Sequence, residues 1–464
     1  MRSRPHRTRF GAPALQESEG AKTDSEREID CEGEHAGSNA QAGTAEAAPR
    51  RLARKGNHVT RRAEIVGGGI AGLSAATALA RAGWQVRVHE QATELREIGS
   101  GIELLENGLR ALDALGVPIG SLKVSEQILS FAIWDERNRP ITSSTMSESS
   151  RCFMTTRSAL HNALLQAATA AGAEIATGSR VTGATADGHV YLANGGPVKA
   201  DIVVGADGIG SRIRTAMGFS SVSRDLRYVS KRTLIPLTAD DPRGSFPGYW
   251  YRSRRIGVGP CGPGLLYVFL YCRPDDQRGC AIPLDRESWT ASFPHLAHVF
   301  SRIDDENVDV RRVWEVICRP WTRGRVALIG DAAHAMAPHL GQAACMAMES
   351  AVVLAEIIEQ PGDVENALRA WEARRRPFVD PARRYGHVYN SFMMGWPARH
   401  PALRSTLVHI AYRSRAVRKR IEGAPALAPQ GPLTHPVKPP QSDDGHDSDG
   451  RKQHRGEDNA QAPG

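Results

Sequence analysis

Residues 64–90 place the tightest constraint on the fold, because they read as a strand, a glycine-rich turn, a helix and a second strand. The segment is EIVGGGIAGLSAATALARAGWQVRVHE, and its glycines Gly67, Gly69 and Gly72 fall at G-x-G-x-x-G spacing. The first glycine permits a tight turn, the second lets a pyrophosphate approach the backbone, and the third lets helix and strand pack closely. The segment therefore predicts a βαβ unit that binds a dinucleotide.

The acid at the end of the second strand narrows the choice of dinucleotide. Glu90, followed by Gln91, stands where a carboxylate can accept hydrogen bonds from an adenosine ribose. A carboxylate there also disfavours a 2′-phosphate, so FAD or NAD is expected in this unit rather than NADP. The alternative, an ordinary strand–turn–helix, would need neither three glycines at this spacing nor the terminal acid.

The two ends of the 464-residue chain differ from its middle. Residues 1–60 lack apolar periodicity, and residues 424–464 are first Pro-rich and then polar, so both are predicted to be disordered tails. The structured body is expected at 61–423. The first tail has 10 basic and 9 acidic residues, a net charge of +1, and the second has 4 basic and 6 acidic residues, a net charge of −2. Because the whole chain carries +8, the body carries +9. That charge suits an anionic cofactor.

A basic cluster near the end of the body raises the alternative of nucleic-acid binding. Its members share helical spacing with apolar residues and are Arg404, Arg413, Arg415, Arg418, Lys419 and Arg420. A solvated helix face explains them adequately, so no nucleic-acid partner is expected.

The N-terminal segment, the hydropathy and the cysteines indicate the cellular compartment of the protein. The basic opening MRSRPHRTRF lacks the apolar core of a secretory signal, and the acidic stretch that follows argues against a transit peptide. An over-long start is the simpler interpretation, with the body beginning just after Val59. No uncharged apolar run reaches 18 residues, so no membrane span is expected. The seven cysteines show neither C-x-x-C nor metal-ligand spacing, which indicates a cytoplasmic protein without a metal site.

Two later stretches repeat the pattern of a strand, an acid and a helix start. They are DIVVGADGIGSRIR at 201–214, with Asp207 at its turn, and GRVALIGDAAHAMAPHLGQAACMAMESAVVL at 324–354, with Asp331. In the second, Gly341 and Gln342 open a long helix whose N-terminus can stabilise negative charge. Between the two stretches, aromatic and β-branched segments of strand length predict an antiparallel sheet that could wall a substrate pocket.

Together the three stretches, in this order and spacing, resemble the single-component, group A FAD-dependent monooxygenases typified by salicylate and para-hydroxybenzoate hydroxylases. The resemblance covers about 61–395. It implies an α/β fold: a Rossmann-type FAD-binding domain, an inserted antiparallel β-sheet substrate lobe and a C-terminal helical region. The FAD-binding parts are expected at about 61–120, 155–218 and 318–360, the substrate lobe at 122–154 and 220–317, and the helices at 361–423.

The resemblance assigns cofactor roles by position. Gly67, Gly69 and Gly72 would hold the FAD pyrophosphate, and Glu90 the ribose. Arg157 would contact the flavin cofactor, Asp207 would link FAD and NAD(P)H binding, and Asp331 would bind the ribityl chain. The loop that would face the flavin N1–C2=O edge begins Gly341, Gln342, Ala343 and Ala344.

The chain departs from the family pattern in this loop, where alanines replace the usual Gly-Gly and Glu349-Ser350 replaces Glu-Asp. If Ala343 or Ala344 needed a positive φ, flavin binding would be altered. His339 stands where the urate hydroxylases carry an Asp, and Pro338-His339 looks more like the salicylate-type enzymes.

The implied reaction is reduction of FAD by NADH or NADPH, capture of O₂ as a flavin C4a-hydroperoxide, and hydroxylation of a small organic substrate, which is expected to be aromatic. His339 is the predicted catalytic residue, as a base or hydrogen-bond donor, with a structural histidine as the alternative. Arg232 and Tyr249 are weaker candidates for substrate contact. The competing functions are a same-fold epoxidase, Baeyer–Villiger-type oxygenase or reductase, and a non-catalytic flavin-binding protein. A monomer or homodimer is expected.

Overall fold

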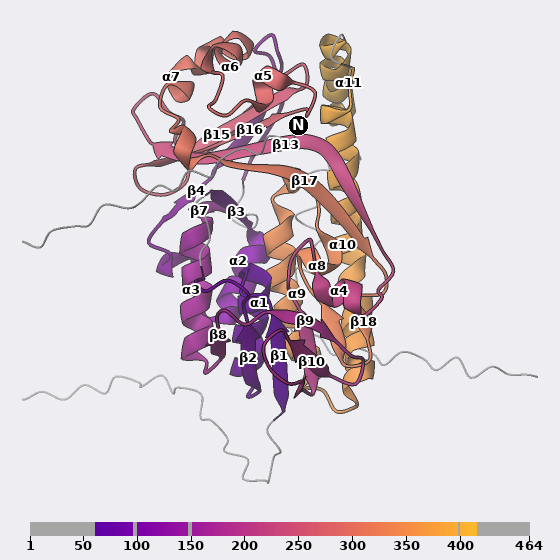
Figure 1. Cartoon of the computed structure of the whole chain (residues 1–464). Coiled ribbons are helices and arrows are strands. Elements are labelled where there is room, and N and C mark those ends of the chain that lie inside the picture. The colour runs from indigo at the N-terminus through magenta and orange to yellow at the C-terminus, as the bar shows by residue number, and fades with distance from the viewer. Residues whose placement is uncertain (1–60, 96–99, 147–150, 398–399, 415–464) are drawn as a thin grey trace, which may run out of the picture. The chain divides into compact units, whose positions relative to one another are not determined.

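A computed structural model describes residues 61–95, 100–146, 151–397 and 400–414 of the chain (Figure 1). The predicted tails lie outside these residues, as do positions 415–420 of the basic cluster. None of the helices in the described ranges combines the length and hydropathy that a bilayer-spanning helix needs.

A six-stranded sheet carries the predicted dinucleotide-binding unit. Its order is β18-β19-β12-β1-β2-β8, and all neighbours are parallel except the edge pair β18–β19. The strands are β1 (Arg62–Val66), β2 (Gln85–His89), β8 (Glu174–Ala176), β12 (Ile202–Gly205), β18 (Thr322–Arg323) and β19 (Val326–Leu328). The carboxyl ends of β1, β12 and β19 meet at one edge, so the turns that follow them, at Gly67, Asp207 and Asp331, lie together.

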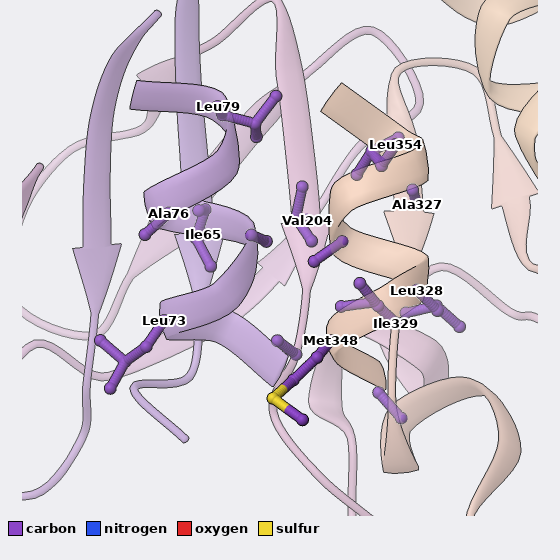
Figure 2. Packing of buried hydrophobic residues seen from close by; sticks show 14 of the residues in the cluster. Ile65, Leu73, Ala76, Leu79, Val204, Ala327, Leu328, Ile329, Met348 and Leu354 are labelled. Atoms are coloured by element: carbon purple, nitrogen blue, oxygen red, sulfur yellow. The ribbon is translucent and has the colours of Figure 1, made fainter. Parts of the chain in front are cut away.

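Helices α1 (Ile70–Arg81) and α9 (Gln342–Ile358) lie side by side against this sheet (Figure 2). Leu73, Ala76 and Leu79 of α1 are buried, and Gly83, which has a positive φ, follows the end of the helix. Each leucine so buried contributes about 1.5–3 kcal/mol. Two further helices belong to this part, α2 (Glu106–Leu115) and α3 (Arg157–Ala170). Asn107 lies inside α2 and donates to Gln342 Oε1 at 3.0 Å.

The predicted antiparallel sheet is present as seven strands in the order β17-β13-β16-β15-β14-β5-β6, in which β14 and β5 alone are a parallel pair. The strands are β5 (Ser130–Trp134), β6 (Pro140–Thr145), β13 (Ser221–Pro236), β14 (Ser245–Tyr251), β15 (Arg254–Pro260), β16 (Leu265–Cys272) and β17 (Asp309–Cys318). Short helices α5 (Gln277–Cys280), α6 (Arg286–Ser292) and α7 (Ala297–Phe300) lie over one face (Figure 1). Trp289 of α6, Phe293 and Phe300 of α7 share one hydrophobic core with residues of the sheet.

Two three-stranded antiparallel sheets complete the strands of the described residues. One has the order β3-β7-β4 and the other β11-β10-β9. Their strands are β3 (Gly101–Leu105), β4 (Ser125–Gln127), β7 (Cys152–Thr156), β9 (Val181–Ala184), β10 (His189–Leu192) and β11 (Val198–Lys199). Thus β5 and β6 join the large sheet, whereas β7 pairs with β3 on one side and β4 on the other.

The C-terminal helices are α10 (Val364–Met394), which packs against α9, and α11 (Pro401–Arg413). The expectation that Arg404 lies on a solvated face is wrong. Arg404 is 2% exposed, lies over the Trp250 ring at 5.0 Å and donates to the Arg252 carbonyl. Leu403, Leu407 and Ile410 face outward instead. Periodicity showed a two-faced helix but did not show which face is buried.

Candidate functional site

The glycine turn after β1 is shaped by contacts that a side chain would block. A Cβ on Gly67, whose φ is +106°, would lie 2.4 Å from the Ala206 carbonyl oxygen. A Cβ on Gly72 would lie 1.9 Å from the Gly67 carbonyl oxygen, so this glycine permits the close packing of α1 on β1. Gly69, the N-cap of α1, has open space beside it and lines a cavity. The turn thus leaves room for a phosphate group at the start of a helix.

Glu90 lies at one end of the same cavity, beside Gln91. Its Oε2 accepts from the Gly68 N–H at 2.9 Å, and Oε1 accepts from the Ala92 N–H at 2.8 Å. A buried pair that the sequence patterns did not reveal lies behind it. His89 Nε2 is 2.5 Å from Glu64 Oε2.

Asp207 lies at the second turn, and its carboxylate organises α4 (Arg212–Ala216). Asp207 Oδ1 accepts from Ser211 Oγ at 2.5 Å, and Oδ2 accepts from the Arg212 N–H at 2.7 Å. Arg214 is buried and donates to the Ala332 carbonyl at 2.7 Å, which ties α4 to α8 (Asp331–His334). The second and third stretches are therefore one connected wall.

The third stretch presents the N-terminus of α9 to the cavity. Gly341 precedes the helix with φ +63°, whereas Ala343 and Ala344 are already helical. The left-handed residue is therefore a glycine, and neither alanine is strained. Gln342 is 1% exposed, and its Nε2 has no hydrogen-bond partner among the described residues. An orphaned donor at the cavity wall fits a ligand that carries an acceptor.

All of the predicted cofactor-binding and catalytic residues except Gly72 line one cavity of about 1360 Å³. Those on its wall are Gly67, Gly69, Glu90, Gln91, Arg157, Asp207, Asp331, His339, Gly341, Gln342, Ala343 and Ala344. The volume, the glycine cradle and the Gln342 donor fit a bound FAD.

The far end of the cavity is aromatic and contains His339, which lies in a short helical turn, η4 (Pro338–Leu340). Tyr228 stacks on its ring at 5.4 Å between centroids. Its Nδ1 is 2.9 Å from Arg255 Nη1, and its Nε2 is 3.1 Å from Asn390 Oδ1. Because the arginine and the amide oxygen have fixed roles, His339 accepts at Nδ1 and donates at Nε2.

The same surroundings keep His339 neutral. Burial, helped by the charge of Arg255, lowers the pKa of His339 to about 3. Its lone pair is already used by Arg255. The prediction that His339 is catalytic stays a prediction, but the hydrogen-bond pattern favours a role in holding Arg255.

Arg255 is the principal residue of this wall that sequence reasoning missed. Its guanidinium lies 4.9 Å above the Phe269 ring, and its buried Nε has no partner among the described residues. The neighbouring Arg254 pairs with Asp276 instead, at 2.6 Å. In the run RSRRIGVG only the alternation of a strand could have distinguished the two, since successive side chains point to opposite faces.

Of the two weaker candidates for substrate contact, only Arg232 lies at the cavity. Arg232 lines the cavity and donates from Nε to Ser230 Oγ at 2.9 Å. Tyr249 is not among the cavity-lining residues and packs against His295 with ring centroids 4.6 Å apart.

Residues 60–384 match the family model of the FAD binding domain. The chain belongs to this family, the group A, aromatic-hydroxylase-type FAD-dependent monooxygenases. It is 38% identical over 387 residues to a putative 2-heptyl-3-hydroxy-4(1H)-quinolone synthase of Rhodococcus erythropolis, covering 80% of this chain and 97% of the relative.

Solved structures of monooxygenases agree with the fold. A tetrameric form of 2-methyl-3-hydroxypyridine-5-carboxylic acid oxygenase is 33% identical, with a TM-score of 0.70 over 80% of this chain and 98% of that one. A Klebsiella pneumoniae protein complexed with FAD and uric acid is 25% identical, with a TM-score of 0.69 over 81% and 98%. The protein is thus an FAD-dependent monooxygenase that uses NAD(P)H and acts on an aromatic substrate, as predicted.

Proposed function

We propose that this monooxygenase hydroxylates a nitrogen heteroaromatic ring that carries an oxo or hydroxyl oxygen, with O₂ as co-substrate. The observation that carries the proposal is the Arg255 guanidinium, which is held at the aromatic end of the cavity and whose buried Nε–H has no partner among the described residues. Such a donor suits a ring oxygen with partial or full negative charge. The names of the relatives, a quinolone synthase, a hydroxypyridine-carboxylate oxygenase and a uric acid complex, support this class.

The aromatic walls define the shape of the substrate. Phe246, Phe269, Tyr271 and Tyr389 line this end of the cavity. Flat rings of this kind favour offset or edge-to-face contact with a planar ligand. A planar heterocycle between them would place its oxygen toward Arg255.

His339 acts in this proposal as a positioning residue. Asn390 donates from Nδ2 to the Leu226 carbonyl at 3.2 Å, and its Oδ1 accepts from His339. This series of hydrogen bonds, which runs from Leu226 through Asn390 and His339 to Arg255, fixes the direction of the guanidinium. A neutral imidazole serves this purpose without repelling the arginine.

The remaining predicted residues are proposed to hold the cofactor. Gly67 and Gly69 with the α1 N-terminus would bind the pyrophosphate, Glu90 and Gln91 the adenosine, Asp331 the ribityl chain, and Gly341 to Ala344 the pyrimidine edge of the flavin. Arg157 and Asp207 would complete the wall. When bound, FAD supplies electron transfer from NAD(P)H and activation of O₂, while these residues bind, orient and exclude water.

The test begins with the purified protein reconstituted with FAD. NADH and NADPH oxidation would be followed with a panel of 4-quinolones, hydroxypyridine carboxylates, salicylate and unsubstituted quinoline. Heteroaromatics with a ring oxygen should stimulate oxidation and give a product heavier by one oxygen atom in mass spectrometry. Stimulation by salicylate alone, or a ring-expanded or epoxide product, would contradict the proposal. Failure to retain FAD would remove its basis.

The predicted assembly and location remain proposals as well. We propose a monomer or homodimer in the cytoplasm, which light scattering and fractionation would test. The similar 2-methyl-3-hydroxypyridine-5-carboxylic acid oxygenase has a tetrameric form, so a tetramer is the outcome that would contradict the proposed monomer or homodimer.

A further inference from the structure

Glu103 is an acid in the cofactor end of the cavity that the proposed function does not use. It lies in β3 opposite Met154 of β7 and is partly buried, and it is one of the cavity-lining residues. A Cβ on Gly341 would lie 2.3 Å from Glu103 Oε2, so the carboxyl group packs directly against the residue that opens α9. Glu103 and the N-terminus of α9 therefore form one continuous surface.

No cation neutralises this carboxylate at hydrogen-bond distance within the described ranges. Its recorded donor is the Cys152 thiol, 3.8 Å from Oε1. Cys345 of α9 donates its thiol to the Glu103 backbone carbonyl at 3.7 Å. Burial raises the pKa of Glu103 to about 7, partly offset by the Cys152 hydrogen bond and by the more distant charge of Arg255. A carboxyl group of this kind changes protonation near neutral pH in response to modest changes in nearby charge.

The other titratable groups around it do not compete for a proton near pH 7. On β7, burial raises the pKa of the Cys152 thiol well above its ordinary value. On α9, burial raises the pKa of Cys345 to about 12. On β16, Tyr267 packs against Gly101, and burial raises the pKa of its phenol. His339 of η4 is neutral, because burial lowers its pKa to about 3.

We propose that Glu103 is a redox-linked proton acceptor, which takes up one proton from solvent when the FAD beside the α9 N-terminus is reduced. This inference rests on the proposed placement of the flavin pyrimidine edge at Gly341 to Ala344. The two electrons and one proton of the hydride come from NAD(P)H, which leaves as NAD(P)⁺, and the flavin gains one negative charge. That charge and the Glu103 carboxylate would then share one helix N-terminus. Repulsion between like charges favours the neutral acid, Glu-COO⁻ + H⁺ → Glu-COOH.

The experiment measures the midpoint potential of bound FAD against pH from 7.5 to 9, where Glu103, with a pKa of about 7, is ionised before reduction, in wild type and in Glu103→Gln. Two protons should accompany two electrons in the wild type and one in the variant, so the potential of the wild type should fall with pH about twice as steeply. Glu106→Gln is the matched control, because Glu106 pairs with Arg151 at 3.0 Å and is not among the cavity-lining residues. Its slope should equal that of the wild type.

A second measurement needs no variant. The infrared difference spectrum of the wild-type holoenzyme, reduced minus oxidised, should show a protonated carboxyl carbonyl band that appears on reduction. Equal slopes in wild type and Glu103→Gln, or no such band, would overturn this inference while leaving the proposed function intact. If the wild type itself retains no FAD, the proposed function fails, and this inference fails with it.

Discussion

Arg255 is the residue whose replacement tests the substrate assignment most directly. Arg255→Gln keeps much of the side-chain volume but removes the charge. A hydrogen bond to a charged group contributes about 1.5–3 kcal/mol, so KM for an oxygen-bearing heteroaromatic should rise roughly 10- to 150-fold. KM for an analogue without the ring oxygen should change little. Arg273→Gln, at an exposed arginine paired with Asp275, is the control. A uniform loss across all substrates would indicate collapse of the wall instead.

His339 gives a second prediction, on pH dependence. With its pKa lowered to about 3, His339 stays neutral above about pH 5 and adds no ionisation to kcat/KM between pH 5.5 and 8. His339→Asn should lower kcat/KM because Arg255 loses its anchor, and should leave the shape of the pH profile unchanged. Steady-state kinetics over this range would check it. An ionisation near pH 6.5 that disappears in the variant would restore the interpretation of His339 as a base.

The residues that could be predicted from the sequence share a local signature. Gly67, Asp207 and Asp331 each follow a strand and precede a helix, so spacing alone identifies them. Arg255 is positioned by a hydrogen bond to His339, 84 residues away in the sequence, and Gln342 by a hydrogen bond from Asn107, 235 residues away. No local pattern encodes such pairs, because they depend on how the sheets and helices meet.

Among the elements, α9 carries the clearest prediction. Ala343 and Ala344 occupy ordinary helical positions, so restoring the family's glycines should not improve FAD binding. The double variant Ala343→Gly/Ala344→Gly should instead lower the free energy of unfolding by about 1–2 kcal/mol, at 0.5–1 kcal/mol per glycine. Urea denaturation and FAD titration would measure the two effects. Tighter FAD binding in the variant would show that the alanines do hinder the cofactor.

The second departure from the family pattern on α9, Glu349-Ser350 in place of Glu-Asp, leaves no buried charge unpaired at this position. Glu349 and Arg375 of α10 form a buried ion pair at 2.8 Å, and Ser350 Oγ accepts from Arg375 Nε at 3.1 Å. The serine that replaces the family's Asp thus completes the bonding of the arginine without adding a second buried charge. Helices were expected at 361–423, but no feature of the sequence predicted this pairing.

At the scale of the whole molecule, two buried histidines predict how stability depends on pH. Burial lowers the pKa of His334 to about 4 and that of His339 to about 3, against about 6.5 in an unfolded chain. The unfolded state therefore binds more protons below pH 6.5, and stability falls as the pH drops. Glu103, with its pKa raised to about 7, takes up a proton in the folded state over the same range and acts in the opposite direction, so the measurement is made in the Glu103→Gln variant. Between pH 7.5 and 5.5 this variant, free of FAD, should lose about 2–3 kcal/mol in urea unfolding, at up to about 1.4 kcal/mol per histidine and pH unit.

His334→Phe supplies the control for this prediction. His334 packs against Trp321 at 5.1 Å, and both of its ring nitrogens lack partners among the described residues, so an aromatic ring without nitrogens should fit. The variant should lose about half of the pH-dependent change. An unchanged slope would mean that His334 is not the group that titrates.

The sequence predicted that a parallel and an antiparallel sheet are present, but it did not predict all of their strand pairings. The parallel sheet and its helices follow from three strand–turn–helix stretches, and the large antiparallel sheet from aromatic strand segments. The parallel pairing of β5 with β14, and the separation of β4 and β7 into a small sheet with β3, join segments far apart in the chain. Hydrophobic periodicity gives the faces of a strand but not its partner.

The long strands β13 and β17 limit how this enzyme can be divided. β13 begins two residues after Phe219, in the core of the dinucleotide-binding part, and reaches Ile235 in the core beneath α5 to α7. β17 returns alongside it and brings Cys318 back to the first core. Figure 1 shows both strands descending from the large sheet toward α4. A gene cut at the apparent border of the two halves would sever shared strands, so swapping a substrate lobe from a relative requires exchanging both strands as well.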